Sequence, residues 1–245
     1  MIGLGLAALA LVYVRGWTRL RTTSPAAIPA WRAGVFLVGL VLIWIAAGSR
    51  VACCDEGSLT MHMVQHLLLL TMAPLLILLG EPVMVLGART RLGHDRTLGL
   101  ALCWFPATAA LVGWHLPAAF TLALRSHAWH AVEQATFLAT GLLFWWPVVQ
   151  PWPSRPNPRW SIVLYLFLAT LPCDILSGFL MFSDRIAYPV YLVARSAQTV
   201  LDDQQCAAAL MWTCVTIVYL VAGTVVSTQL LAPVPGRILQ RVEVD

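Results

Sequence analysis

The chain has 245 residues, of which 60% are hydrophobic and only 11% are charged. Soluble domains usually carry about 25% charged residues, so this composition excludes a soluble globular protein. The formal net charge of +4 does not indicate nucleic acid binding, because the arginines fall between apolar segments and act as topology signals. We therefore expect a single integral membrane domain over residues 1–245.

Seven apolar segments follow one another along the chain, and we predict that each is a transmembrane helix. About 20 apolar residues span a hydrocarbon core of about 30 Å, and a helix satisfies its backbone hydrogen bonds without water. The first apolar run is short, so it either spans with Trp17 as an interfacial anchor or begins upstream, and we expect no cleaved signal peptide. The predicted spans are 2–16, 31–50, 61–87, 98–116, 129–150, 160–182 and 204–231.

The arginines are distributed unevenly between the two sides of this predicted bundle. Eleven belong to the connections after the first, third and fifth spans or to the C-terminal tail, and four belong to the other side. Because cytoplasmic loops are enriched in Arg and Lys, the pattern predicts an N-terminus outside and a C-terminus in the cytoplasm. The expected fold class is an all-α polytopic membrane bundle of seven transmembrane helices.

The third predicted span begins with two histidines on one helical face. His62 and His66 are four residues apart, so a helix places them one turn apart. A polar side chain in lipid costs several kcal/mol unless something binds it, and both histidines lie at the outer end of a very apolar segment. This spacing suits two ligands of one metal ion.

Four other predicted spans bring polar side chains to the same outer layer. His115 ends the fourth span, and His130 and Glu133 share a face of the fifth span at i, i+3. Asp203 opens the seventh span. Asp174 and Met211 lie deeper, and neither belongs to the predicted ligands.

Imidazole and carboxylate groups on facing helices build metal sites in helix bundles. Imidazole suits Cu, Zn or Fe, and nearby Met and Cys sulfur favours Cu(I), so the expected ion is copper. The predicted metal ligands are His62, His66, His115, His130, Glu133 and Asp203.

Most of these residues also have simpler explanations. Asp203 could be a helix N-cap, and Glu133 could orient a histidine without touching the metal. A histidine at a helix end is usually interfacial, as we expect for His127. His94 lies beside an aspartate in a cytoplasmic loop, and we interpret it as solvated.

The sulfur-containing residues carry a weaker signal. Packing is the favoured interpretation of Met61, Met63, Met72 and Met211, because methionine fills irregular gaps in cores more often than it binds metal. The adjacent Cys53 and Cys54 lack the CxxC spacing, so a metal-handling or redox pair and a disulfide-bonded pair both stay open. Their role is not assigned.

Several short motifs occur in a fixed order along the chain. They are His62-Met-Val-Gln-His66, Ala73-Pro74, Leu79-Gly-Glu-Pro82, Trp114-His115-Leu-Pro117, His130-x-x-Glu133 with Gly141 to Pro147, Leu171-Pro172 to Phe182, and Asp203-Gln204-Gln205 leading to Leu210-Met211-Trp212. In combination they resemble the seven-helix CtaG family of bacterial cytochrome c oxidase assembly factors. The resemblance covers nearly everything from the second span onward.

The resemblance implies a bacterial plasma-membrane protein that is needed to mature haem–copper oxidases at the copper step. Its implied partners are oxidase subunits, a copper donor of unknown identity and membrane lipid, without nucleic acid. The resemblance does not assign metal ligands. One position departs from the family pattern, because a second histidine is expected one turn after His130 and this chain has Gln134 there.

The main hypothesis is a non-enzymatic assembly factor that binds copper at the outer membrane face and delivers it to the oxidase. One alternative is a membrane redox metalloprotein with a haem or a di-metal centre. The other is a metal-free scaffold for oxidase subunits, in which interhelical hydrogen bonds hold the polar layer together. A haem would give a visible absorption band, and a scaffold would lose stability but no metal when its histidines are replaced.

Overall fold

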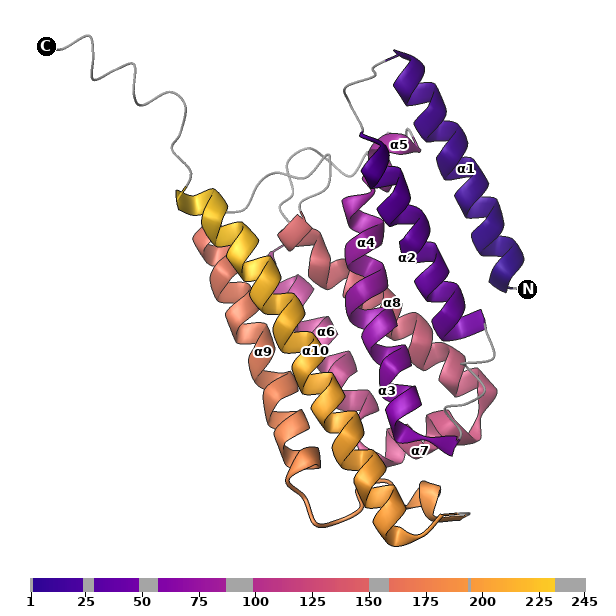
Figure 1. Cartoon of the computed structure of the whole chain (residues 1–245), viewed down its shortest axis with the longest axis vertical. Helices are drawn as coiled ribbons and strands as arrows, with labels where there is room; N and C mark the ends of the chain where they lie inside the picture. The colour runs from indigo at the N-terminus through magenta and orange to yellow at the C-terminus, as the bar shows by residue number, and fades with distance from the viewer. Residues whose placement is uncertain are drawn as a thin grey trace, which may run out of the picture.

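The computed structural model describes residues 2–23, 29–48, 57–86, 99–149, 159–193 and 195–231, and the regular structure in these ranges is entirely helical (Figure 1). Successive long helices turn back on one another and run antiparallel. The long helices are α1 (Ile2–Thr23), α2 (Ala30–Gly48), α6 (Leu100–Trp114), α8 (His127–Val149), α9 (Arg159–Met181) and α10 (Ala197–Leu231). A continuous rod consists of α3 (Leu59–Leu67), the π-helix η3 (Leu68–Met72) and α4 (Ala73–Leu79). Shorter helices are α5 (Pro82–Val85), α7 (Pro117–Arg125) and the 3-10 helix η4 (Pro189–Val193).

Each of the seven predicted spans coincides with a long helix or with the rod. Among the described residues, α2, the rod, α9 and α10 are long and apolar enough to cross a membrane, and the bent pair α6–α7 is a fifth if it counts as one span. Arginines in α1 and the histidines and glutamate in α8 make these two helices less apolar. The prediction of an all-α membrane protein is confirmed, whereas the count of seven spans and the orientation of the termini stay predictions.

The rod changes its backbone pattern where it passes α8. Pro74 lacks a backbone N–H, so the carbonyl of Leu70 loses its usual helical partner, and the π-helical turn lies immediately before it. A Cβ atom on Gly141 of α8 would lie 2.5 Å from that Leu70 oxygen and 2.7 Å from Pro74 Cγ. Glycine is therefore required at position 141. Because it has no side chain, α8 can approach the rod closely.

A sharp bend separates α6 from α7, a short helix that the hydropathy pattern does not reveal. The two axes differ by 76°. Leu116 between them is extended (φ −65°, ψ 132°), because the following Pro117 disfavours helical backbone at the preceding residue. The helix α6 therefore ends at Trp114 and holds His115 as its C-cap, where the side chain is buried.

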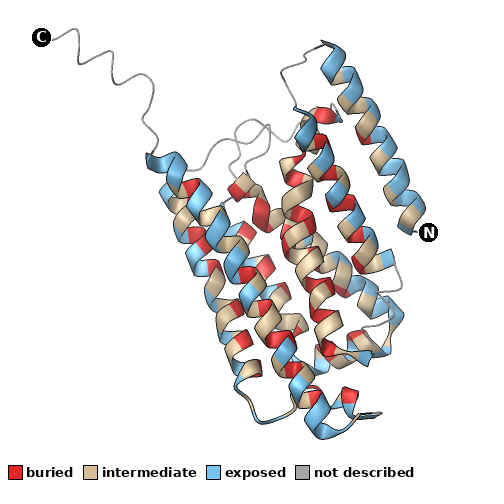
Figure 2. Cartoon of the chain, in the orientation of Figure 1, coloured by how far each residue is buried: buried red, intermediate tan, exposed pale blue. Residues whose placement is uncertain are grey.

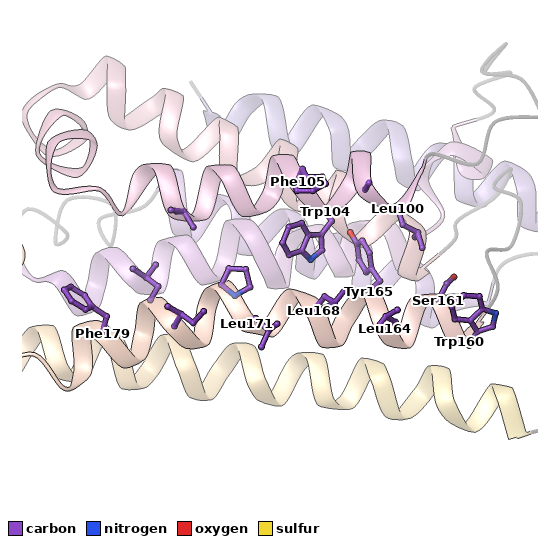
Figure 3. A pocket seen from close by; sticks show the side chains of 15 residues that line it. Leu100, Trp104, Phe105, Trp160, Ser161, Leu164, Tyr165, Leu168, Leu171 and Phe179 are labelled. Carbon is purple, nitrogen blue, oxygen red and sulfur yellow. The ribbon is translucent and has the colours of Figure 1, made fainter.

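The outer surface of the bundle is apolar, as a lipid-facing surface must be. Figure 2 shows buried residues concentrated along the inward faces of the central helices. On α9 the side chains of Ile175 and Phe179 are 72% and 69% exposed. An apolar groove of about 920 Å³ follows α9 beside α6, from Trp160 to Phe179 (Figure 3). Hydrocarbon can cover such a surface at no cost in hydration.

The two ends of the bundle differ in their polar contents. We call the lower end in Figure 1, where α3 and α8 begin and α6 ends, the histidine end. At the opposite end, beside α5, the Tyr13 hydroxyl donates to the Gly80 carbonyl (2.7 Å). There the Arg32 guanidinium donates to Glu81 Oε1 at 2.6 Å, across a turn in which Glu81 has a positive φ of 52°.

Candidate metal centre

Two histidines of α3 form the middle of the site. His62 and His66 are both buried, and their ring centroids are 4.3 Å apart. The four-residue spacing puts both rings on the face of α3 that is turned toward α8. Phe120 of α7 packs on the His62 ring and Phe137 of α8 on the His66 ring, with centroids 4.8 and 4.3 Å apart. These aromatic contacts restrict both imidazoles.

Glu133 of α8 brings a carboxylate to this pair. Its Oε1 lies 3.3 Å from His66 Nε2 and 3.6 Å from His62 Nε2. One ligand atom from each of the three residues lies within 4.8 Å of the others. Around an ion with bonds of about 2.0–2.1 Å, neighbouring ligand atoms are about 3.3 Å apart in a tetrahedron and about 3.5 Å apart in a trigonal plane. The two separations between the carboxylate oxygen and the imidazole nitrogens, 3.3 and 3.6 Å, match such a coordination shell.

His130 lies at the rim of this cluster. Its Nε2 is 4.0 Å from Glu133 Oε2, and its ring stacks on His62 with centroids 5.7 Å apart. The Gln134 amide nitrogen donates to the same Nε2 across 3.1 Å. The His130 side chain is 17% exposed, whereas His62 and Glu133 are fully buried. The cluster is therefore closed except on the His130 side.

His115 reaches the cluster from the end of α6. Its ring centroid is 5.5 Å from that of His66. Its Nδ1 is 2.7 Å from the Leu111 carbonyl oxygen, and its Nε2 is 3.3 Å from Met63 Sδ. The Tyr188 hydroxyl, from the connection before η4, donates to the His115 backbone carbonyl (2.9 Å). These contacts fix both the ring and its backbone.

Asp203 of α10 has a different environment. Its carboxylate accepts hydrogen bonds from the backbone N–H groups of Leu59 and Thr60 at 2.9 and 3.3 Å and from the side chains of Ser58 and Thr60. The Arg195 guanidinium donates to it at 2.8 Å. A carboxylate at a helix N-terminus satisfies free N–H groups and complements the helix dipole. The structure thus brings five of the six predicted ligands together and places Asp203 at the start of α3, so we leave it out of the proposed coordination.

The polar atoms at the centre of the site have few other partners. Among the described residues, neither ring nitrogen of His66 and neither carboxylate oxygen of Glu133 has a hydrogen bond, and the same holds for the buried amide of Gln65. Buried carboxylates without a cation or donors are costly. Two imidazole nitrogens and a carboxylate oxygen converging on one point therefore fit a divalent or monovalent transition-metal ion.

The remaining predicted residues lie outside this cluster. Asp174 of α9 has a buried Oδ1 without a hydrogen bond among the described residues, and Met211 of α10 is buried in an apolar cluster. His127 is exposed at the start of α8. Cys53, Cys54 and His94 fall outside the described residues.

Two contributors to the site were not predicted. Met63 was interpreted as packing, yet its sulfur contacts His115. Tyr188 lies in a connection between two predicted spans and still reaches the His115 backbone. The Met-rich run before His66 was the available signal for Met63, whereas nothing in the local pattern around Tyr188 reveals which helix it contacts.

Comparisons with known proteins point to one family. The family model for cytochrome c oxidase caa3 assembly factors (Caa3_CtaG) matches residues 11–232. Uncharacterized proteins of Mycobacterium bovis and Mycobacterium tuberculosis are each 28% identical to this chain over an alignment of 183 residues, with a coverage of 64% of this chain and 27% of each relative. One from Mycobacterium leprae is 25% identical over 199 residues, covering 73% of this chain and 30% of the relative. The match thus spans less than a third of these relatives, and no solved structure matches the chain.

Proposed function

This chain belongs to the family of cytochrome c oxidase caa3 assembly factors, and from that premise we propose that it carries a copper ion for a haem–copper oxidase. The ion is held between His62, His66 and Glu133. The observation that supports this proposal is the triangle of buried ligand atoms, in which two imidazole nitrogens lie 3.3 and 3.6 Å from one carboxylate oxygen. The ion is cargo, so the protein needs no catalytic residue.

The donor set favours copper over harder ions. Imidazole binds Cu and Zn well, whereas Mg²⁺ and Ca²⁺ prefer shells made only of oxygen. The thioether of Met63, which contacts His115 beside His66, favours Cu(I) over Zn(II). An oxidase assembly factor with this donor set therefore serves the copper step of oxidase maturation.

We place the histidine end on the outer face of the bacterial plasma membrane. In this orientation seven helices cross the membrane, the N-terminus is outside, and the side richer in arginine faces the cytoplasm. Copper then reaches the site from the extracytoplasmic side through the rim at His130. The receiving oxidase subunit approaches the same rim.

A delivery site must release its ion as well as bind it. Three ligands from two helices leave at least one coordination position free, on the partly exposed side of His130. The Gln134 amide donates a neutral hydrogen bond to the His130 ring, and a bond of this kind is worth about 1 kcal/mol. In the proposed mechanism His130, which is partly exposed at the rim, turns toward the ion to bind it and away from it to admit a ligand of the oxidase.

The test is copper binding by the purified full chain, paired with oxidase activity in cells that carry the same variants. Wild type should bind copper, and the double substitution His62→Ala with His66→Ala should abolish both copper binding and oxidase assembly. His127→Ala is the control, because His127 lies on α8, as Glu133 does, but is exposed outside the cluster. Full oxidase assembly by a variant that binds no copper would overturn the proposal.

A further inference from the structure

His115 has only one tautomer that satisfies its surroundings. A backbone carbonyl can only accept a hydrogen bond, so His115 Nδ1, 2.7 Å from the Leu111 oxygen, must carry the proton and donate it. In the neutral imidazole the other nitrogen, Nε2, then has a lone pair and no hydrogen. The opposite tautomer would set two acceptors against each other at 2.7 Å.

The lone pair of His115 Nε2 points at a second acceptor. Met63 Sδ lies 3.3 Å away, and a thioether has no hydrogen to donate. Both side chains are buried, with Met63 only 1% exposed. A second proton on the ring would place an imidazolium in this buried position, which is costly. A cation between the nitrogen and the sulfur would satisfy both lone pairs.

We infer that Met63 and His115 are ligands of a second site, which binds a soft monovalent ion of the Cu(I) type. The inference rests on the proposed function and extends it to a separate ligand pair. Thioether and imidazole together select Cu(I) and not hard cations. With bonds of about 2.0 Å to nitrogen and about 2.3 Å to sulfur, the 3.3 Å separation corresponds to an angle of about 100° at the ion. The pair thus occupies two corners of a shell that takes further ligands.

A small cavity lies beside His115, and Met63 is not among the residues that line it. It has a volume of about 30 Å³ and is lined by His66, His115, Cys173 and Met211 among other residues. About 10–15 Å³ already accommodates one water molecule, so the space suffices for one ion or one small ligand. Two of these lining residues carry sulfur, and both are buried. Two further sulfur-containing side chains therefore line the space next to His115, where they could complete the coordination of an ion bound by the pair.

The two sites adjoin each other through His66. Its ring centroid is 4.3 Å from that of His62 and 5.5 Å from that of His115, and Met63 follows His62 directly in α3. An ion passes between the sites by ligand exchange, in which a bond to His66 nitrogen forms as the bond to Met63 sulfur breaks. The ion stays Cu(I) throughout, so no electron donor or acceptor takes part.

The experiment uses Ag(I), a soft monovalent ion, with the full chain in detergent. X-ray absorption at the silver edge reports sulfur neighbours directly, and competition with a chelator reports affinity. Wild type should show bound Ag(I) with at least one sulfur ligand. Met63→Leu should lose that sulfur and bind Ag(I) more weakly by roughly tenfold or more, comparable to the loss seen when metal sites are perturbed. Met72→Leu, in the same rod but outside the site, is the matched control and should behave as wild type.

A parallel titration with Zn(II), which has no need of a thioether, separates this inference from the proposed function. Met63→Leu should keep Zn(II) at His62, His66 and Glu133, whereas His62→Ala should lose Zn(II) and keep Ag(I) with its sulfur ligand. Ag(I) without a sulfur neighbour, or equal affinity in wild type and Met63→Leu, would overturn the second site alone. Sulfur-bound Ag(I) without Zn(II) binding would overturn the first site alone. The exchange of Met for Leu conserves side-chain volume and usually lowers stability by less than about 1.5 kcal/mol. We therefore expect Met63→Leu to stay folded.

Discussion

The two glutamates Glu81 and Glu133 occupy opposite ends of the bundle and have opposite surroundings. The side chain of Glu81 is 14% exposed and accepts a hydrogen bond from the guanidinium of Arg32 at 2.6 Å. The side chain of Glu133 is fully buried and lies within 4.0 Å of three imidazoles, with no Arg in ion-pair contact among the described residues. Glu81 thus has a cationic partner within the chain, the guanidinium of Arg32. The ion-pair contacts of Glu133 among the described residues are all with histidines, which can bind metal.

This difference separates a structural end from a functional end. An ion pair between two side chains is complete in the folded chain, so Arg32 and Glu81 fasten α2 to the turn before α5. A buried carboxylate among neutral imidazoles is incomplete without a cation. If the proposed function is correct, the polar residues of the histidine end should lower the stability of the metal-free chain and provide affinity for the metal. The following substitutions test this comparison, beginning with the largest expected effect.

Replacing Glu133 should affect metal binding and stability in opposite directions. Glu133→Gln removes a ligand charge, and we expect at least roughly 100-fold weaker Zn(II) or copper binding, since even indirect perturbations cost 10–100-fold. The free energy of unfolding of the metal-free protein should rise by about 1 kcal/mol or more, because an uncompensated buried charge is removed. Metal titration and denaturation of the same preparations measure both quantities.

Glu81→Gln is the matched control for that substitution. It leaves Arg32 without its partner, so we expect the free energy of unfolding to fall by about 1 kcal/mol, a modest value for a partly exposed pair. Metal affinity should not change. If the two variants shifted stability in the same direction, the contrast between the two ends would be wrong.

Gly141→Ala should disturb the site from a distance. Its Cβ would lie 2.5 Å from the Leu70 carbonyl oxygen, so α8 must move away from the rod at a cost of about 1–3 kcal/mol. The shift displaces Glu133, and metal affinity should fall with stability. Gly178→Ala on α9 is the control, because nothing lies within 4 Å of a Cβ there, and its effect should stay within about 1 kcal/mol.

Asp203→Asn should lower stability and leave metal binding intact. The change weakens the hydrogen bonds to Leu59 and Thr60 and the pair with Arg195, which we expect to cost about 1 kcal/mol. Asp202→Asn is the control, because its exposed carboxylate contacts only Gln198 among the described hydrogen bonds. Loss of metal from Asp203→Asn at unchanged stability would instead show that Asp203 is a ligand.

Of these substitutions, Gln134→His should have the smallest effect, and it should slow the release of the bound ion. A second imidazole at the rim, one turn from His130, offers a further ligand. We expect tighter binding by a few-fold, on the order of 1 kcal/mol, and slower transfer of the ion to a chelator. Stopped-flow measurement of chelator capture compares the rates. Faster release from this variant would contradict the role assigned to the rim.

The helices and the centre of the site follow from local patterns. Apolar length predicts the long helices, and the spacings of His62 with His66 and of His130 with Glu133 each fix a shared face. Because both motifs begin a helix at the same end, their meeting could be anticipated. The bend before α7 could not be predicted, because the fourth predicted span ended at residue 116 and hydropathy gives no information on the direction of the helix that follows.

The positions of Asp203 and Met63 could not be predicted for a different reason. Asp203 immediately precedes the predicted span 204–231 and was a candidate local N-cap, but α10 begins already at Ala197, and the Asp203 carboxylate caps α3, more than 140 residues earlier in the chain. Met63 contacts His115 only because α6 ends where it does. Contacts of this kind depend on how helices dock, and a single sequence does not encode them in any local spacing.

The central claim is that one ion is bound by both imidazoles of α3. Electron paramagnetic resonance of the Cu(II)-loaded full chain tests it most directly, because coupling to ligand nitrogen counts the coordinating imidazoles. We predict coupling to two nitrogens in wild type and to one in His66→Ala. A spectrum without nitrogen coupling, or one that His66→Ala leaves unchanged, would contradict the claim.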